Sequence, residues 1–192
     1  MLLYPSIYLM GDQTKLSFRL NNDEIRAGGV LLYRVNEQNK QIEFLLAKNG
    51  KRYEDLGGKI DKCDADIYET IAREVKEESN NLINYNSIIL RIKENNPIFV
   101  KYSKYMLFII ESNNYERDLT SEMFGIREIH DNIDRTVHWI SFDNFFEFEK
   151  QKKINPRLAN KGVYNALNLL KNKGKIQINI KDIKKENINY LF

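Results

Sequence analysis

The stretch from Gly57 to Leu82 reads GGKIDKCDADIYETIAREVKEESNNL, and it contains more structural information than any other part of the chain. It opens on a glycine pair and then turns into a helical pattern. Apolar residues recur every fourth position from Ile67 onward, so they form a stripe that spans about 80° on a helical wheel. We therefore predict a glycine loop over 56–61 and a helix from Ile67 to Glu78, whose apolar stripe consists of Ile67, Ile71 and Val75.

Both ends of this predicted helix carry suitable end residues. Asp64 or Asp66 can act as the N-cap, because a short carboxylate accepts a hydrogen bond from the free backbone N–H groups of a first turn. The run Ser79-Asn80-Asn81 should end the helix, since asparagine tolerates the left-handed conformation of a C-terminal cap.

Two glutamates of the helix, Glu74 and Glu78, lie one turn apart at the edge of the apolar stripe. Like charges in a partly buried place repel, so a positive group should compensate. On an ideal wheel Arg73 and Lys76 point elsewhere, on the solvent side with Glu69 and Glu77. A divalent cation is the economical solution, since hard cations such as Mg²⁺ prefer carboxylate oxygens.

The alternative is an ordinary solvated helix, because most glutamate pairs at this spacing bind nothing. The glycine pair Gly57-Gly58 shifts the balance, since glycine lets the backbone approach a metal or phosphate closely. The glutamate pair and the glycine loop together are more specific than either feature alone.

The rest of the chain predicts an α/β or α+β sandwich in a single domain of residues 1–192, with an N-terminal extension over about residues 1–24 and a lysine-rich tail over about 172–192. Ala27–Arg34 and Gln41–Lys48 should form a hairpin, and 113–134 a polar loop beside the substrate. Further strands are expected at 88–92, 102–111, 137–140 and 176–180, and a helix at 161–171.

Composition fits a globular protein: 42% of residues are apolar, and 30% charged residues leave a net charge of only +3. The single cysteine, Cys63, excludes an internal disulfide and fits a reducing compartment. We find no signal-peptide layout or membrane span, so we expect a soluble, cytoplasmic protein.

The 57–82 stretch resembles the signature box of the Nudix hydrolase family. That box runs Gly, five residues, Glu, seven residues, then Arg-Glu-apolar-any-Glu-Glu-any-Gly-apolar. The segment from Arg73 to Glu78 matches its most informative part in order, and Gly57-Gly58-Lys59 matches its opening. The flanks are also similar, so the resemblance extends from about Ala27 to Phe148, and it implies a mixed β-sheet flanked by helices.

Three departures from the box stand out. The loop between Gly58 and Arg73 has one extra residue, which puts Asp64 or Ala65 where the family has its first glutamate; we favour Asp64. Asn80 replaces the closing glycine and tolerates the same backbone. Asn81 takes the last apolar position, with Leu82 one residue later.

The resemblance implies a catalytic set of Arg73, Glu74, Glu77 and Glu78. Glu74 and Glu78 would bind Mg²⁺ or Mn²⁺ with the backbone carbonyl of Gly57, Glu77 would be a further ligand or the base, and Arg73 would orient the glutamates. A base outside the box is a further alternative, with Glu128 and Glu122 as candidates, although a plain surface position is the better expectation for each. For substrate contacts we predict Gly58, Lys59, Arg26 and Lys48. Phe44, Tyr53 and Tyr105 could stack on a base, although core packing is the better expectation for Phe44.

The activity implied is hydrolysis of a phosphoanhydride bond in a nucleoside diphosphate linked to another group. The substrate could be a nucleoside triphosphate, a dinucleotide, a nucleotide sugar, an inositol pyrophosphate or the cap of a capped RNA, which would suit the lysine-rich tail. A homodimer is also compatible with the family. The alternatives are a non-catalytic nucleotide-binding regulatory module and a structural protein with an incidental glutamate-rich helix.

Overall fold

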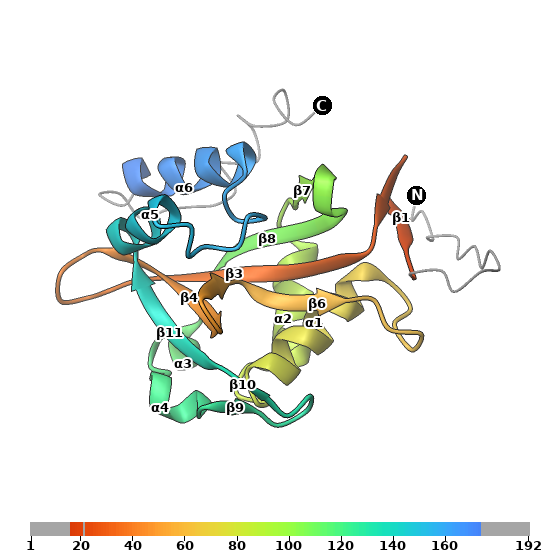
Figure 1. Cartoon of the computed structure of the whole chain (residues 1–192), viewed down its shortest axis with the longest axis horizontal. Helices are drawn as coiled ribbons and strands as arrows, with labels where there is room; N and C mark the ends of the chain where they lie inside the picture. The colour runs from red at the N-terminus through yellow and green to blue at the C-terminus, as the bar shows by residue number, and fades with distance from the viewer. Residues whose placement is uncertain (1–15, 21, 174–192) are drawn as a thin grey trace.

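The computed structural model describes residues 16–20 and 22–173, and a mixed β-sheet lies at its centre (Figure 1). Neighbouring strands follow the order β11-β4-β3-β8-β7, with β5 paired to β4 and β6 paired to β3. Within this sheet only β3 and β8 run parallel. The strands are β3 (Ala27–Val35), β4 (Ile42–Asn49), β5 (Arg52–Glu54), β6 (Leu56–Lys59), β7 (Ile98–Val100), β8 (Tyr105–Glu111) and β11 (Thr136–Ser141).

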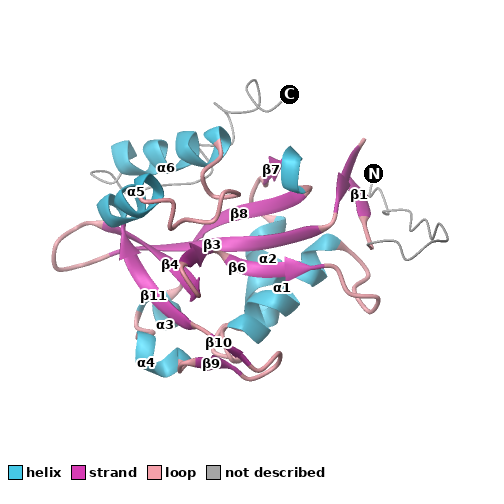
Figure 2. Cartoon of the chain, in the orientation of Figure 1, coloured by secondary structure: helices cyan, strands magenta, loops and turns pink. Residues whose placement is uncertain are grey.

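Helices cover both faces of the sheet (Figure 2), so the α+β sandwich expected from the sequence is confirmed. On one face lie α1 (Ile67–Glu78) and α2 (Tyr85–Lys93); on the other lie α5 (Phe142–Lys150) and α6 (Lys161–Lys173). Side chains alternate along β3, so Val30 and Leu32 join the core under α1, whereas Leu31 and Tyr33 join the core under α6. All four are fully buried.

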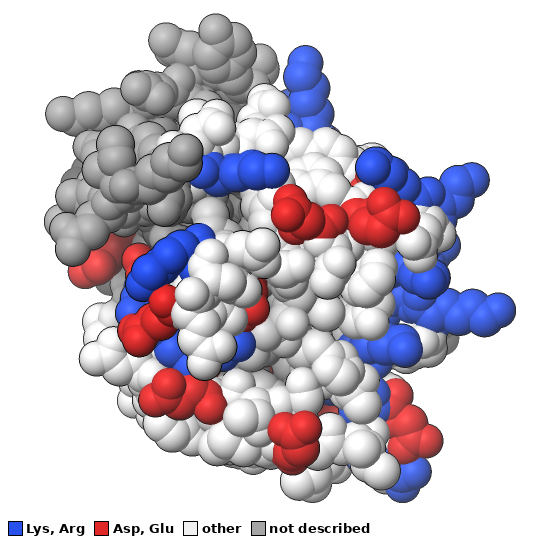
Figure 3. Space-filling model, turned by 90° about the vertical axis from the view of Figure 1, so that its left-hand side faces the viewer, with Lys and Arg blue, Asp and Glu red and all other residues white. Residues whose placement is uncertain are grey.

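Smaller elements surround this sandwich. A hairpin of β1 (Phe18–Leu20) and β2 (Asp23–Ile25) precedes β3. The segment expected as a polar loop over 113–134 is more regular than that, because it contains α3 (Asn114–Arg117), α4 (Ser121–Phe124) and a hairpin of β9 (Arg127–Glu128) and β10 (Ile133–Asp134). On the face shown in Figure 3, basic and acidic side chains lie beside one another at several places around a broad uncharged area.

The predicted helix Ile67–Glu78 is confirmed residue for residue. Asp66 is its N-cap and accepts a hydrogen bond from the backbone N–H of Glu69, and Asn80 adopts the left-handed conformation with φ of 51°. The helix predicted at 161–171 is also confirmed and continues to Lys173. The strand predicted at 176–180 lies outside the described residues.

Two of the strand predictions were wrong in detail. The segment 88–92 is not a strand but part of α2, because Asn84 caps that helix and the i,i+4 pair Ile88 and Ile92 is buried on one face. The predicted strand 102–111 begins only at Tyr105, since a 3₁₀ turn, η1 (Lys101–Ser103), precedes it.

The glycine loop predicted over 56–61 is in fact strand β6 at Leu56–Lys59. Gly57 and Gly58 pair with Gly29 and Gly28 of β3, and a β-carbon on Gly57 would overlap the carbonyl oxygen of Gly28. The glycines are therefore needed for close strand packing directly above α1. None of the described helices has the length and apolarity to cross a membrane.

Candidate active site

Three glutamates of α1 gather beneath β6. Their side chains are similarly enclosed, with exposed fractions of 17% for Glu74, 18% for Glu77 and 14% for Glu78. The helical wheel had separated Glu77 from the other two as a solvent-side residue, and that separation was wrong. Asp64 in the loop before α1 and His130 in the β9–β10 hairpin contact the side of the helix that the wheel assigned to solvent.

Arg73 links Glu74 to Glu77, although the helical wheel placed it on the side of Glu77 and away from Glu74. Its Nη1 donates to Oε1 of Glu74 at 3.0 Å and to Oε2 of Glu77 at 2.9 Å. On its other side, Arg73 donates from Nε and Nη2 to both oxygens of Asp64, at 2.9 and 3.0 Å, and from Nη2 to the carbonyl of Lys59. This fork geometry fixes the guanidinium, which in turn holds two glutamates in place.

Asp64, favoured as the counterpart of the family's first glutamate, is nearly inaccessible, with 4% of its side chain exposed. Besides Arg73, it accepts hydrogen bonds from the Thr70 hydroxyl and the Asp61 backbone N–H, both at 2.8 Å. Burial alone would raise the pKa of Asp64, but the Arg73 guanidinium and these two donors hold it below its usual value. Asp64 is thus an ionised anchor for Arg73.

The glycines of β6 contact the glutamates directly. The backbone N–H of Gly57 donates to Oε2 of Glu78 at 2.6 Å. A β-carbon on Gly58 would overlap the carboxylate of Glu74. The glycine pair therefore lets a β-strand backbone lie against two carboxylates, which no other residue type at position 58 would allow without displacement.

A second arginine, Arg135, completes the site, and the sequence reasoning missed it. It immediately precedes β11 and is only 7% exposed. Its Nη1 lies 2.8 Å from Oε1 of Glu78 and 3.2 Å from Oε2 of Glu128, and its Nη2 donates to the backbone carbonyl of Glu78. Fifty-seven positions separate Arg135 from Glu78, and no local pattern marks it.

The two candidates for a base outside the box lie in different places. Glu128 is buried beside Arg135, although the sequence suggested a plain surface residue. Burial raises its pKa, against the effect of Arg135, and Glu77 raises it further. Glu122 is instead exposed on α4, close to His138 and not to the glutamate cluster.

The electrostatics of the cluster favour a cation. Burial raises the pKa of Glu78 to about 8, although Arg135 and the N–H of Gly57 oppose the rise, and burial also raises the pKa of Glu74. The cluster comprises five carboxylates (Asp64, Glu74, Glu77, Glu78 and Glu128) and two guanidinium groups (Arg73 and Arg135). Such an excess of buried oxygen ligands suits Mg²⁺ or Mn²⁺.

The β9–β10 hairpin adds further donors at the rim. Ligand atoms of Glu128, His130 and Asp131 lie within 4.8 Å of one another, and Nε2 of His130 is 3.5 Å from Oε1 of Glu77. His130 and Asp131 are exposed, so this group borders the buried cluster without closing it.

The predicted substrate residues are only partly assembled. Gly58 lies in the site, and Lys59 is exposed beside it. Arg26 pairs with Glu24 at 2.5 Å, and Lys48 lies 5.8 Å from the ring of Tyr53, so among the described residues neither forms an ion pair with the α1 glutamates.

Of the residues considered for stacking on a base, two are unavailable. Phe44 is fully buried in the core, and the Tyr105 hydroxyl donates to the buried Asp55 at 2.6 Å, beneath the guanidinium of Arg157. Tyr53 is partly exposed and stacks on Phe148, with ring centroids 4.8 Å apart.

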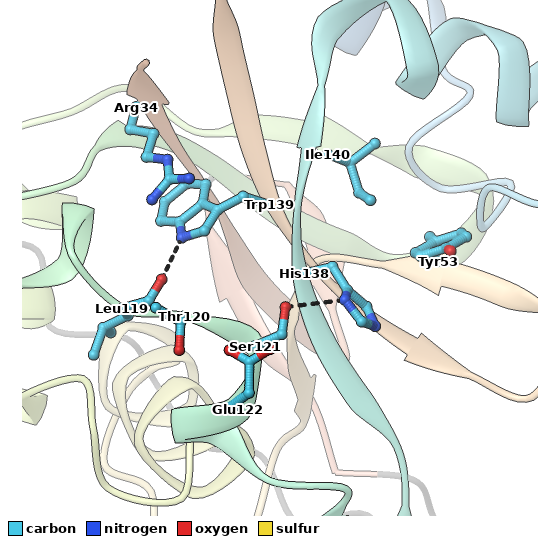
Figure 4. A pocket seen from close by; sticks show the side chains of 9 residues that line it. All are labelled: Arg34, Tyr53, Leu119, Thr120, Ser121, Glu122, His138, Trp139 and Ile140. Carbon is cyan, nitrogen blue, oxygen red and sulfur yellow. Dashed lines mark hydrogen bonds between the residues drawn. The ribbon is translucent and has the colours of Figure 1, made fainter. Parts of the chain in front are cut away.

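A separate pocket of about 400 Å³ opens at β11 (Figure 4). Its walls come from β11, from β3 and β5, and from the segment that enters α4. The lining residues are Arg34, Tyr53, Leu119, Thr120, Ser121, Glu122, His138, Trp139 and Ile140.

Comparison with known proteins gives a fold likeness only. No family model and no curated protein matches the sequence. The structure is similar to a binary complex of an Ap4A hydrolase from C. elegans, with 20% identity and a TM-score of 0.38 over 64% of this chain and 84% of that chain. It is also similar to a MutT/nudix family protein from Enterococcus faecalis, with 16% identity and a TM-score of 0.39 over 62% of this chain and 44% of that chain.

Proposed function

We propose that this chain is a Nudix-type hydrolase that uses a divalent cation to cleave a phosphoanhydride bond in a nucleoside diphosphate linked to another group. The observation that carries the proposal is a cluster of four glutamates: Glu74 and Glu78 lie against the glycine strand β6, Arg73 bridges Glu74 and Glu77, and Arg135 bridges Glu78 and Glu128. An incidental glutamate-rich helix would not keep its carboxylates buried and braced by two arginines.

The residues present fit Mg²⁺ or Mn²⁺, which Glu74, Glu78, Glu77 and the carbonyl of Gly57 would hold. When bound, the cation would neutralise phosphate oxygens and lower the pKa of a bound water. Arg73 keeps Glu74 and Glu77 in one orientation through its hydrogen bonds at 3.0 and 2.9 Å. The N–H of Gly57 does the same for Glu78.

Among the candidates for the base, Glu128 is the one we propose. It combines burial at the cluster with a raised pKa, and a general base works best when its pKa approaches the working pH. Its Oε2 faces Arg135, so Oε1 would accept the proton from the attacking water. Glu122 does not fit this role, since it lies in the β11 pocket.

The substrate could be a nucleoside triphosphate, a dinucleotide, an inositol pyrophosphate or an RNA cap. The test is release of phosphorylated products from a panel of these compounds with Mg²⁺, with Mn²⁺ and with EDTA. We expect Glu74→Gln and Glu128→Gln to lose at least about 10²-fold in kcat, as is typical when a proton-transfer group is removed.

A matched control for these variants is Glu94→Gln, which makes the same change in an exposed residue at the end of α2. This variant should retain full activity. If wild-type protein hydrolyses nothing on the panel with either metal, the enzyme proposal fails. The non-catalytic nucleotide-binding module would then be the better account, provided that nucleotides still bind.

A further inference from the structure

The β11 pocket, whose lining side chains are drawn in Figure 4, is outside the glutamate cluster, but two of its strands, β5 and β11, also lead to that cluster. Arg135 belongs to the cluster and lies three residues before His138, which lines the pocket. At about 3.3 Å per strand residue, the Cα atoms of these two residues are about 10 Å apart. Tyr53 lines the other side and is followed by Glu54, whose charge contributes to the raised pKa of Glu78. A nucleoside seated here would extend its phosphates toward the cluster.

The cationic groups of the pocket are already engaged or neutral. Arg34 pairs with Glu43 at 2.7 Å and lies over the Trp139 ring, 4.3 Å from its centroid. Burial lowers the pKa of His138, and the nearby Lys48 lowers it further. A lining without an available cation does not suit a phosphate, so the pocket favours an uncharged part of a ligand.

The histidine also helps to shape the pocket. Its Nδ1 lies 3.0 Å from the hydroxyl of Ser121 and its Nε2 lies 2.7 Å from that of Thr136, so the ring connects β11 to the first residue of α4. The next residue, Glu122, is exposed at the pocket, and a hydrogen bond from Thr120 holds its pKa below the usual value. An ionised carboxylate is therefore presented beside partly exposed aromatic side chains.

From this lining we propose that the pocket binds the base of a guanine nucleotide. Glu122 would accept hydrogen bonds from N1–H and the 2-amino group of guanine, two adjacent donors that match the two oxygens of a carboxylate. Trp139 would supply aromatic surface for the base, whereas Tyr53 lies on the other side of β11 (Figure 4) and stacks on Phe148. Adenine places the acceptor N1 beside its amino group, which a carboxylate repels. This inference rests on the proposed function, because it makes the substrate a guanosine diphosphate linked to another group.

The chain provides a local reporter, since Trp139 is its only tryptophan and lines the pocket. The experiment titrates the full chain in EDTA with GMP, IMP and AMP and follows tryptophan fluorescence, so binding is measured without metal or hydrolysis. We expect GMP to bind at least about tenfold more tightly than AMP, since a bidentate base contact typically discriminates to that extent. IMP, which lacks the 2-amino group, should fall between them.

Glu122→Gln should abolish the preference for GMP, because the amide offers one acceptor in place of two. Glu94→Gln is the matched control and should leave the preference unchanged; far-ultraviolet circular dichroism checks that each variant is folded. Equal affinities for GMP and AMP in the wild-type chain, or a GMP preference that survives Glu122→Gln, would overturn the inference.

The same protein is assayed in parallel for hydrolysis of GTP and ATP with Mg²⁺, which separates the two proposals. Selective GMP binding without hydrolysis of any compound leaves the pocket assignment standing and removes the proposed function. Hydrolysis with equal kcat/KM for both nucleotides, together with no fluorescence response to GMP, leaves the function standing and removes the pocket assignment.

Discussion

The raised pKa of Glu78 predicts how the free energy of unfolding depends on pH, and this prediction can be tested without a substrate. Burial raises its pKa from 4.5 in the unfolded chain to about 8 in the folded protein. The folded state therefore binds this proton more tightly, so the free energy of unfolding contributed by Glu78 is fully present below pH 4.5 and is lost as the pH rises through about 8. Between pH 5 and 8.5 this loss amounts to about 4 kcal/mol, at 1.36 kcal/mol per pKa unit.

Glu78→Gln removes the titration, so the difference in unfolding free energy between wild type and variant should change by about 4 kcal/mol over that range, in favour of the variant at high pH. Urea unfolding at a series of pH values, in EDTA and followed by circular dichroism, measures it. For Glu94→Gln, at the exposed end of α2, the difference in unfolding free energy from wild type should stay constant over this pH range. A constant difference for Glu78→Gln as well would refute the burial argument.

Three further predictions concern the residues that brace the site. Arg135→Met should destabilise the protein by about 3–5 kcal/mol at pH 8, because it leaves two buried glutamates unpaired; a loss below 1 kcal/mol in urea unfolding would contradict this. Gly58→Ala should reduce the hydrolytic activity at least about tenfold, because the added β-carbon would overlap the carboxylate of Glu74. The control is Gly50→Ala, in a turn with open space around it. This variant should lose only about 1–2 kcal/mol of stability and keep its activity. Asp64→Asn should cost about 3 kcal/mol in thermal or urea unfolding, because it uncouples a buried ion pair; an unchanged midpoint would contradict that.

The sequence predicted α1 correctly because every signal for it is local. Its apolar spacing, its cap at Asp66 and its stop at Asn80 all lie within one short segment. The segment 88–92 failed for the opposite reason. Its run of isoleucines suits a strand by composition. The helix is indicated only by the cap at Asn84 and by the burial of Ile88 and Ile92 on one helix face.

The candidate site was predictable along the segment 57–78, and beyond that segment only Glu128 was named from the sequence. An ideal wheel places side chains by angle, but Arg73 is long enough to reach Glu74 as well as its i,i+4 neighbour Glu77. Arg135 and Glu128 join the site through the path of the chain between β8 and β11, which no local pattern encodes. That these two charged side chains are buried can be recognised only from the folded structure.

The most direct test of the central claim is the release of phosphorylated products from the best substrate of the panel, measured against Mg²⁺ concentration for wild type, Glu78→Gln and Glu94→Gln. We predict turnover that requires Mg²⁺ or Mn²⁺, a loss of at least about 10²-fold in Glu78→Gln, and no change in Glu94→Gln. Full turnover in EDTA, or wild-type rates in Glu78→Gln, would contradict the assignment of the chemistry to the α1 carboxylates.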